Sequence, residues 1–297
     1  MIPKIIHYCW FGGNPLPELA QKCIASWKKY FPDYEIKEWN ESNYDVHKIP
    51  YTSESYNAKK YAFVSDYARF DILYQYGGVY FDTDVEVIKP LGDILNDTGF
   101  MGTEELFARM WSNDSLEVGC NAGLGIGVAA GLGICLEILE SYTNEHFFCN
   151  DGVHEYNLKT IVTRVTEILV KYGFDVKSNE IQKVADITIY PPEYFCPINN
   201  ITGKIMITNN TYTVHHFTCN PYTLHHFNFK SWDELKNSWG TKKVLQRKMM
   251  RYSIYKMFGV NIFSNLLIVI MGIINRFLKD GFIHTIRYYF KRYLADK

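Results

Sequence analysis

The strongest constraint on the fold lies in residues 61–88, which read YAFVSDYARFDILYQYGGVYFDTDVEVI. Apolar residues recur at spacings of three and four in the first part, which predicts a helix ended by Gly77-Gly78. The β-branched and aromatic run 79–81 then predicts a strand. This strand carries Asp82 and Asp84 to its carboxyl end, where α/β sheets usually bind ligands.

The two aspartates form a candidate metal site. Side chains alternate along an extended segment, so we expect Asp82 and Asp84 on one side of the strand and Thr83 on the other. Two carboxylates placed in this way attract a hard divalent cation such as Mn²⁺ or Mg²⁺. Asp66 and Arg69 are three residues apart on the preceding helix, which predicts that both side chains lie near the pair. A surface ion pair is the alternative interpretation for Asp66 and Arg69.

The start of the chain predicts a βαβ unit. Residues 3–10 and 35–39 have strand character, and residues 16–30 between them have helical character. Gly12-Gly13 does not complete a GxGxxG motif, so a dinucleotide-binding fold of that type is not indicated. Trp10 follows the first strand and offers a surface on which a nucleobase could stack; a place in the core is the alternative.

The middle of the chain continues the α/β pattern. Residues 121–127, NAGLGIG, are glycine-rich, which fits either a phosphate cradle built from backbone N–H groups or a tight turn. A helix is expected to follow at 131–142. The remaining predicted elements are strands at 99–104, 186–190 and 205–214 and helices at 154–171 and 231–237.

Length and cysteine usage limit the class of protein. A chain of 297 residues suits one large domain, or one domain with an appendage. Its seven cysteines are scattered and contain no CxxC, which favours reduced thiols in the cytosol over a disulfide framework or a zinc cluster. The N-terminus lacks the apolar run of an export signal, so we expect a cytoplasmic protein.

The charge is distributed unevenly along the chain. Residues 241–297 hold twelve Lys or Arg and two Asp, a net charge of +10, whereas residues 1–240 carry 19 basic and 30 acidic residues, a net charge of −11. We therefore predict a catalytic domain at 1–240 and a basic and apolar helical segment at 241–297. This segment is expected to lie on an anionic membrane surface, at the inner face of the cytoplasmic membrane. A helical pair packed on the domain is the alternative.

Three blocks of the sequence resemble glycosyltransferase family 32, the DXD sugar transferases. They are IPKIIHYCWFGG at the start, SDYARFDILYQYGGVYFDTDVEV in the middle and TYTVHHF ending at Phe217. The resemblance extends over roughly residues 1–240. It implies an α/β fold of the GT-A type with a mixed, mostly parallel central sheet, a nucleotide-sugar donor, bound Mn²⁺ or Mg²⁺, and transfer with retention of anomeric configuration.

The resemblance also implies residue roles. Trp10 is expected to stack on the base, Asp66 and Arg69 to hold donor-sugar hydroxyls, and Asn121 to contact the sugar. Tyr80 supports the site, Asp82 contacts ribose and metal, and Asp84 ligates the metal. A histidine, His215 or His216, is expected near the metal or diphosphate. Ser231 and Trp232 after His225 and His226 match the family's donor-binding ending as well, so the two histidine pairs compete and the first is preferred.

These observations predict an enzyme that moves a hexose from a UDP- or GDP-sugar to a glycan or lipid-linked acceptor. Bacterial surface polysaccharide synthesis, such as that of a capsule, is the setting implied by the resemblance, and nucleic acid is not an expected partner. The alternatives are a metal-dependent phosphohydrolase and a non-catalytic glycan-binding protein. A two-metal phosphohydrolase needs further carboxylates or histidines, for which the sequence shows no suitable spacing.

Overall fold

A computed structural model describes residues 1–105, 118–149, 156–157, 159–198 and 205–217. The unit described below comprises Met1–Asn199 and Ile205–His216. The predicted boundary at residue 240 and the predicted C-terminal helices lie outside the described residues, as do His225, His226, Ser231 and Trp232. These remain predictions from the sequence.

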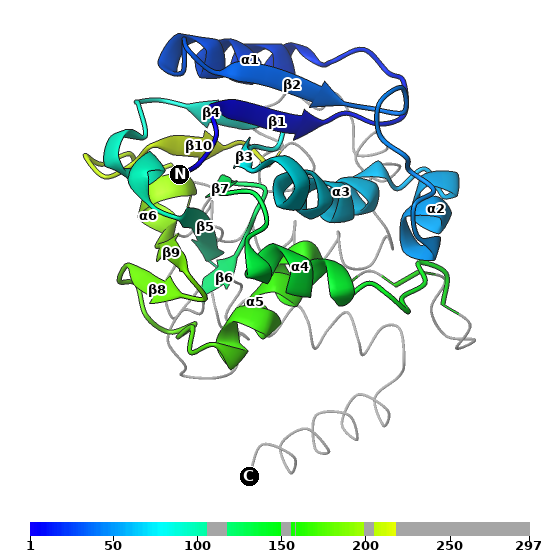
Figure 1. The fold of residues 1–297 in the computed structure, drawn as a ribbon. Helices are drawn as coiled ribbons and strands as arrows, with labels where there is room; N and C mark the ends of the chain where they lie inside the picture. Colours follow the sequence, from blue (N-terminus) through cyan, green and yellow to red (C-terminus); the bar gives the residue numbers. More distant parts are fainter. Residues whose placement is uncertain (106–117, 150–155, 158, 199–204, 218–297) are drawn as a thin grey trace, which may run out of the picture. The chain divides into compact units, whose positions relative to one another are not determined.

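The first three elements form the predicted βαβ unit. Strand β1 (Ile5–Cys9) and strand β2 (Glu35–Trp39) pair in parallel, and α1 (Glu18–Tyr30) connects them. Because side chains alternate along β1, Tyr8 packs against Trp27 of α1, while His7 faces the end of α3 (Tyr61–Tyr76). Helices α1 and α3 therefore cover opposite faces of this part of the sheet (Figure 1).

The central sheet is mixed, as predicted. Its strand order is β2-β1-β3-β7-β5-β9-β8, with β6 paired to β5 at the side. Parallel pairing joins β1 to β2 and β3, and β5 to β9, so five of the seven strands along this path run in one direction. The predicted α/β class with a mostly parallel sheet is thus confirmed. The other strands are β3 (Gly78–Tyr80), β5 (Gly99–Glu105), β6 (Val118–Cys120), β7 (Ile126–Val128), β8 (Gln182–Val184) and β9 (Ile187–Tyr190).

The junction between α3 and β3 has no room for side chains. Gly77 ends α3 with φ 62°, and a Cβ on Gly78 would lie 2.7 Å from the Ile5 carbonyl oxygen. The indole N–H of Trp39 donates to Nδ1 of His7 (3.1 Å), so Nε2 of His7 carries the proton and donates to the Gly77 carbonyl (2.9 Å). Burial lowers the pKa of His7 to about 4, which keeps the ring neutral. The two glycines predicted to end the helix are therefore held against β1. His7 donates to the carbonyl of Gly77, and the Ile5 carbonyl oxygen lies close to Gly78.

A small second sheet carries the end of the described chain. Strand β4 (Val85–Val87) pairs antiparallel with β10 (Thr213–His215), with His215 opposite Val85. The predicted strand at 205–214 was too long, because only its last residues find a partner strand. The predicted helix at 154–171 begins late, as α5 (Ile161–Lys171), where the Thr160 hydroxyl caps it by accepting from the Thr163 N–H (3.3 Å). The remaining helices are α2 (Pro50–Asn57), the 3₁₀ helix η1 (Gly92–Asn96), α4 (Gly133–Glu140) and α6 (Pro192–Phe195).

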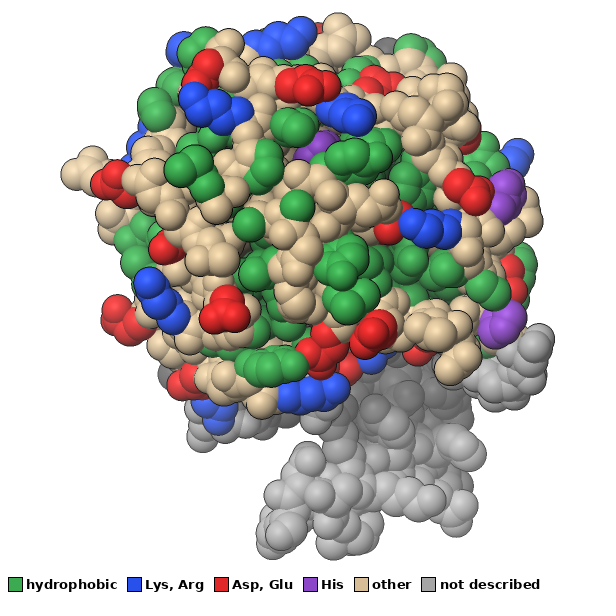
Figure 2. Space-filling model, viewed as in Figure 1, with side chains coloured by type: hydrophobic (Ala, Val, Ile, Leu, Met, Phe, Trp, Pro, Cys, Tyr) green, Lys and Arg blue, Asp and Glu red, His purple; other side chains and the backbone are tan. Residues whose placement is uncertain are grey.

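Two properties of the described residues bear on membrane binding: the distribution of surface charge and the apolar character of the helices. On the face drawn in Figure 2, Lys and Arg side chains are scattered singly among acidic and apolar ones. Among the residues that the structure describes, no helix combines the length and apolar character needed to cross a bilayer.

We predict that Trp27→Phe lowers the free energy of unfolding by about 1–3 kcal/mol, because the buried carbonyl of Val85 loses the indole N–H that donates to it at 2.8 Å. Urea denaturation followed by circular dichroism measures this. Lys28→Ala, on the exposed side of the same helix, serves as the control and should change the value by less than about 0.5 kcal/mol. If both substitutions lower the free energy of unfolding equally, the Trp27–Val85 hydrogen bond does not stabilise the fold.

Candidate active site

The two aspartates lie in a turn, and not on a continuous strand as predicted. Strand β3 ends at Tyr80 and β4 begins at Val85. Between them, the N–H of Val85 donates to the carbonyl of Asp82 at 3.0 Å, which closes a four-residue turn. The alternation argument was therefore wrong. The carboxylates of Asp82 and Asp84 are brought together by chain reversal.

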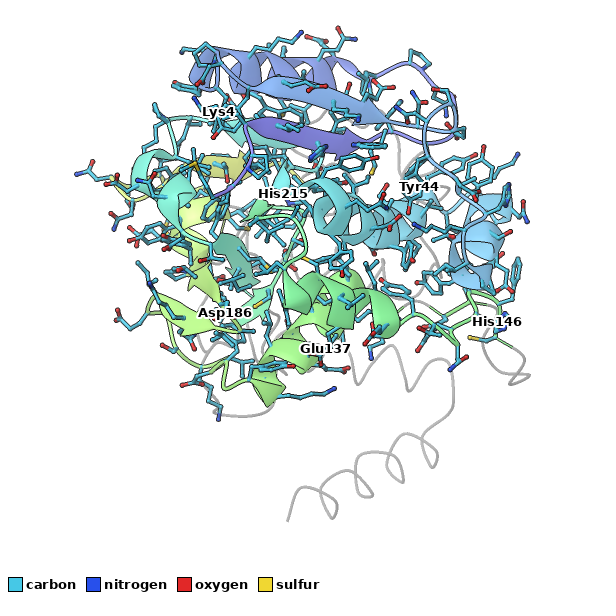
Figure 3. All side chains as sticks on the ribbon, viewed as in Figure 1. Lys4, Tyr44, Glu137, His146, Asp186 and His215 are labelled. Carbon is cyan, nitrogen blue, oxygen red and sulfur yellow. The ribbon has the colours of Figure 1, made fainter. Side chains whose placement is uncertain are left out.

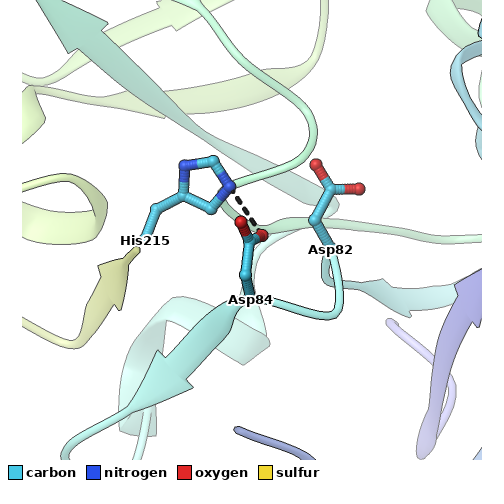
Figure 4. A group of neighbouring side chains, drawn as sticks. All are labelled: Asp82, Asp84 and His215. Atoms are coloured by element: carbon cyan, nitrogen blue, oxygen red, sulfur yellow. Dashed lines mark ion pairs between the residues drawn. The ribbon is translucent and has the colours of Figure 1, made fainter. Parts of the chain in front are cut away.

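His215 completes a three-residue group with these aspartates. Ligand atoms of Asp82, Asp84 and His215 all lie within 4.8 Å of one another, and Nε2 of His215 lies 2.9 Å from a carboxylate oxygen of Asp84 (Figure 4). Figure 3 labels His215 among packed side chains, and it is 8% exposed. Burial alone would lower the pKa of His215, but the Asp84 carboxylate outweighs it and raises the pKa above its ordinary value.

This donor set suits a hard or borderline divalent cation. Two carboxylates and one imidazole offer oxygen and nitrogen ligands of the kind that bind Mg²⁺ or Mn²⁺. The geometry also distinguishes the two adjacent histidines. His216 points to a different partner, Glu86, at 2.9 Å, whereas His215 faces Asp84. Of this first histidine pair, His215 is therefore the one that can serve as a ligand beside the aspartates.

Asp82 is held in place on three sides. Arg69 lies 3.0 Å from one of its carboxylate oxygens, and the Tyr80 hydroxyl donates to the same oxygen at 3.2 Å. The Asp82 N–H donates to the carbonyl of Gly123 (2.9 Å). A Cβ built on Gly123 would lie 2.0 Å from the other carboxylate oxygen. Gly123 is thus a site position that the sequence reasoning missed, although its glycine-rich surroundings were noticed.

The glycine-rich segment is a tight turn between β6 and β7, one of the two alternatives left open by the sequence. Asn121 fixes it, because its side-chain oxygen accepts from the Gly123 N–H (2.8 Å) while its amide nitrogen donates to Glu104 (2.9 Å). Asn121 is 8% exposed. Its side chain therefore supports the turn behind Asp82, and its predicted contact with a sugar stays a prediction.

Asp66 and Arg69 form an ion pair beside the aspartate turn, as the helical spacing predicted. Arg69 lies 3.0 Å from Asp66, and its side chain is 4% exposed against 13% for Asp66. The surface-pair alternative is thus excluded. Burial raises the pKa of Asp66 to about 6, although the Arg69 charge opposes this shift. A single guanidinium consequently bridges two carboxylates, those of Asp66 and Asp82.

Trp10 occupies the neighbouring strand end. It follows β1 directly, and because β1 and β3 are parallel neighbours, Trp10 and the aspartate turn emerge at the same edge of the sheet. The Trp10 ring is partly exposed, and its N–H donates to the Asn14 carbonyl at 2.6 Å. Its predicted role of stacking on a base stays a prediction.

Residues 17–101 match the family described as a glycosyltransferase sugar-binding region containing a DXD motif. The match covers 85 of the 297 residues. The matched region includes Asp66, Arg69, Asp82 and Asp84, so the resemblance predicted from these motifs is confirmed.

Similar curated proteins match over shorter spans. Inositol phosphoceramide mannosyltransferase 1 of Schizosaccharomyces pombe is 32% identical over 111 residues, 34% of this chain and 33% of that protein. Inositol phosphoceramide mannosyltransferase 3 of the same yeast is 34% identical over 103 residues, 32% of this chain and 28% of that protein. The uncharacterized glycosyltransferase L373 of Acanthamoeba polyphaga mimivirus is 32% identical over 123 residues, 38% of this chain and 47% of that protein. The chain thus spans less than half the length of these relatives.

Solved structures that are similar to this chain include two glycosyltransferases. The galactosyltransferase LgtC, in complex with donor and acceptor sugar analogs, aligns with a TM-score of 0.40 at 13% identity, over 84% of this chain and 95% of that one. The PaToxG glycosyltransferase aligns with a TM-score of 0.38 at 18% identity, over 57% of this chain and 68% of that one.

We predict that Gly123→Ala reduces Mn²⁺-dependent nucleotide binding at least about tenfold, because the added methyl group would displace the Asp82 carboxylate. Isothermal titration calorimetry with UDP and with GDP, each in the presence of Mn²⁺, measures the change. Gly133→Ala is the matched control, since a Cβ there meets nothing within 4 Å. If Gly123→Ala binds the nucleotides as tightly as the wild type, nucleotide binding does not require the Asp82 carboxylate in this position.

We predict that ionisation of Asp66 destabilises the metal-free protein. Its pKa is raised from 3.8 to about 6 on folding, so the linked stability is fully present below about pH 4 and is lost as the pH rises through about 6. Relative to Asp66→Asn, the wild type should lose up to about 3 kcal/mol over this range. Urea denaturation of both proteins from about pH 4 to about pH 8 measures the difference. If the free energy of unfolding changes with pH in the same way in both proteins, the pKa of Asp66 is not raised on folding.

Proposed function

We propose that this protein is a metal-dependent glycosyltransferase of the GT-A type that transfers a hexose from a nucleotide-sugar. The observation that carries the proposal is the group of Asp82, Asp84 and His215, whose ligand atoms lie within 4.8 Å of one another. The two aspartates of this group are the DXD motif of the matched region.

Asp84 and His215 are the proposed metal ligands, and Asp82 is placed to contact both the cation and the ribose. Mn²⁺ or Mg²⁺ bound there would act as a Lewis acid that stabilises the negative charge developing on the departing diphosphate. The Tyr80 hydroxyl and Arg69 both contact Asp82, at 3.2 and 3.0 Å. They would hold that carboxylate in one orientation as the donor binds.

Recognition of the donor is assigned to residues around this turn. Asp66 accepts hydrogen bonds from sugar hydroxyls when it is ionised, and the buried Arg69 donates to hydroxyls or phosphate. Trp10 stacks on the base at the end of β1. We keep Ser231 and Trp232 as proposed donor-binding residues on the resemblance of their sequence alone.

We propose that the sugar is transferred with retention of anomeric configuration. The described carboxylates near the turn are already engaged, Asp82 by Arg69 and Asp84 by His215, so neither is free as a nucleophile for double displacement. Departure and attack on the same face of the sugar then fit best. The C–O bond to the diphosphate breaks, the acceptor oxygen bonds to the same carbon, and its proton passes to the departing phosphate.

The acceptor is proposed to be a glycan or a lipid-linked glycan. Two similar yeast proteins are named as mannosyltransferases of inositol phosphoceramide, which is a lipid. The basic and apolar composition of residues 241–297 supports work at an anionic membrane surface, on its cytoplasmic side. A role in bacterial surface polysaccharide synthesis belongs to this proposal on the strength of the sequence resemblance.

The rival functions receive less support. Within the described residues, Asp82, Asp84 and His215 are the one group found with metal-ligand spacing, whereas a two-metal phosphohydrolase needs a second set of ligands. A non-catalytic glycan-binding protein predicts no metal-dependent binding of a nucleotide.

We predict that a nucleotide-sugar raises the melting temperature in the presence of Mn²⁺ and that Asp84→Asn abolishes both this shift and sugar transfer. A bound donor stabilises the folded state by mass action. A thermal-shift screen of UDP- and GDP-sugars, with and without Mn²⁺, measures this. The control is Glu86→Gln, which changes the neighbouring carboxylate that contacts His216 and should keep both properties. The proposal fails if Asp84→Asn transfers sugar within a few-fold of wild type.

A further inference from the structure

The turn after β1 is held by side chains from other parts of the chain. It begins at Trp10 and contains Gly12, whose φ of 97° lies in the left-handed region. The N–H of Gly12 donates to a carboxylate oxygen of Glu41 at 2.5 Å, and the Tyr56 hydroxyl donates to the same oxygen at 3.0 Å. Strands β1 and β2 both point toward α2 in Figure 1. Glu41, after β2, thus links the turn after β1 to α2.

The ring of Tyr61, the first residue of α3, fills the space beside Gly12. A Cβ built on Gly12 would lie 2.3 Å from one ring carbon of Tyr61 and 2.8 Å from two others. The Tyr61 ring also lies 5.4 Å from the ring of Tyr56. Gly12 is therefore held in two ways, by the hydrogen bond from its N–H and by an aromatic ring where a side chain would otherwise lie.

The conformation at Gly12 also sets the direction of the Trp10 ring. The indole N–H of Trp10 donates to the carbonyl of Asn14 at 2.6 Å, and Gly12 lies between these two residues in the chain. A change of backbone conformation at Gly12 would therefore break the hydrogen bond that orients the ring.

Helix α3 connects the same turn to the charged residues of the site. Tyr61 opens this helix, which also carries Asp66 and Arg69. Arg69 lies 3.0 Å from Asp82. Because the helix is held by its own backbone hydrogen bonds, the contact between Tyr61 and Gly12 fixes the turn relative to these residues.

Stability of the fold alone explains these contacts poorly. Glu41 is exposed, and Tyr56 and Tyr61 are partly exposed, so water could replace the hydrogen bonds at little cost. Two adjacent glycines, Gly12 and Gly13, give the unrestrained backbone much conformational freedom. A loop of this kind loses affinity for a ligand through the entropy of ordering, and contacts that fix it beforehand reduce that loss.

We propose that Glu41 and Tyr61 are positioning residues of the nucleotide site, which hold the turn at Gly12 so that the Trp10 ring is oriented to stack on the base. The inference rests on the proposed function, in which Trp10 contacts the base of a nucleotide-sugar. Glu41 and Tyr61 are assigned no contact with the nucleotide, because both act through Gly12. Their effect is therefore expected on ligands that contain a base, and not on a diphosphate bound by the metal group alone.

The first test compares two ligands that differ in the presence of a base. Isothermal titration calorimetry with Mn²⁺ measures the binding of pyrophosphate and of UDP or GDP, whichever the wild type binds more tightly. Tyr61→Ala and Glu41→Ala should each weaken nucleotide binding at least about tenfold and leave pyrophosphate within about twofold. Tyr61→Phe keeps the ring against Gly12 and should bind like the wild type. Tyr172→Ala, which removes an exposed tyrosine after α5, is the matched control and should change neither affinity.

Binding of pyrophosphate shows whether the fold and the metal group are intact in each variant. The proposal is overturned if either alanine variant binds the nucleotide as tightly as the wild type, or if nucleotide and pyrophosphate lose affinity equally. Should Tyr61→Ala not fold, Glu41→Ala, which changes an exposed side chain, decides alone. In a Trp10→Ala background, Tyr61→Ala should cost less than about twofold, because the ring that it positions is already absent. An undiminished loss there would contradict a role through Trp10.

A measurement without ligand separates this inference from the proposed function. Hydrogen exchange is followed by mass spectrometry on a peptide that spans residues 10–17. Glu41→Ala and Tyr61→Ala should each speed exchange in this peptide at least about tenfold, because the turn loses a contact that holds it closed to water. If no nucleotide binds the wild type, the proposed function fails, and the exchange rates alone decide whether Glu41 and Tyr61 hold the turn. Exchange at the wild-type rate in either variant would overturn the inference.

Discussion

The site depends on one buried guanidinium. Arg69 is almost fully enclosed, and it lies 3.0 Å from the carboxylates of both Asp66 and Asp82. Three aspartates, Asp66, Asp82 and Asp84, meet in one small region, and such a cluster repels itself unless cations are interleaved with it. Arg69 separates the first two, and His215 pairs with the third. The arrangement of positive charge thus decides where each carboxylate can lie.

Backbone geometry supplies the room for this charge cluster. Gly78 lets the start of β3 lie close to β1, and Gly123 lets the turn after β6 lie against Asp82, with a Cβ on either residue falling under 3 Å from a neighbouring atom. Neither position tolerates a side chain without movement of its neighbour. Gly77 ends α3 and Gly78 begins β3 directly after it, so the helix that carries Asp66 and Arg69 leads straight into the strand before the aspartate turn.

Local patterns predicted the parts of the site that lie close together in sequence. The helix, the glycine stop, the strand, the Asp66–Arg69 pair and the two aspartates were found, because each depends on spacing within one segment. The turn at Asp82 was misjudged as a strand, since its backbone is set by the bond from Asp82 to Gly123, about forty residues away. The choice of His215 over His216 depends likewise on the register of β10 against β4.

Burial of Asp66 shows why such a site is both unstable and useful. Enclosure raises the pKa of this carboxyl to about 6, so keeping it ionised near neutral pH costs folding free energy. An exposed aspartate would avoid that cost, but its hydrogen bonds to a sugar would compete with water and contribute little. In an enclosed site the same carboxylate gains more from each hydroxyl, since the local dielectric is low. Arg69, 3.0 Å from Asp66, reduces the cost without exposing the group.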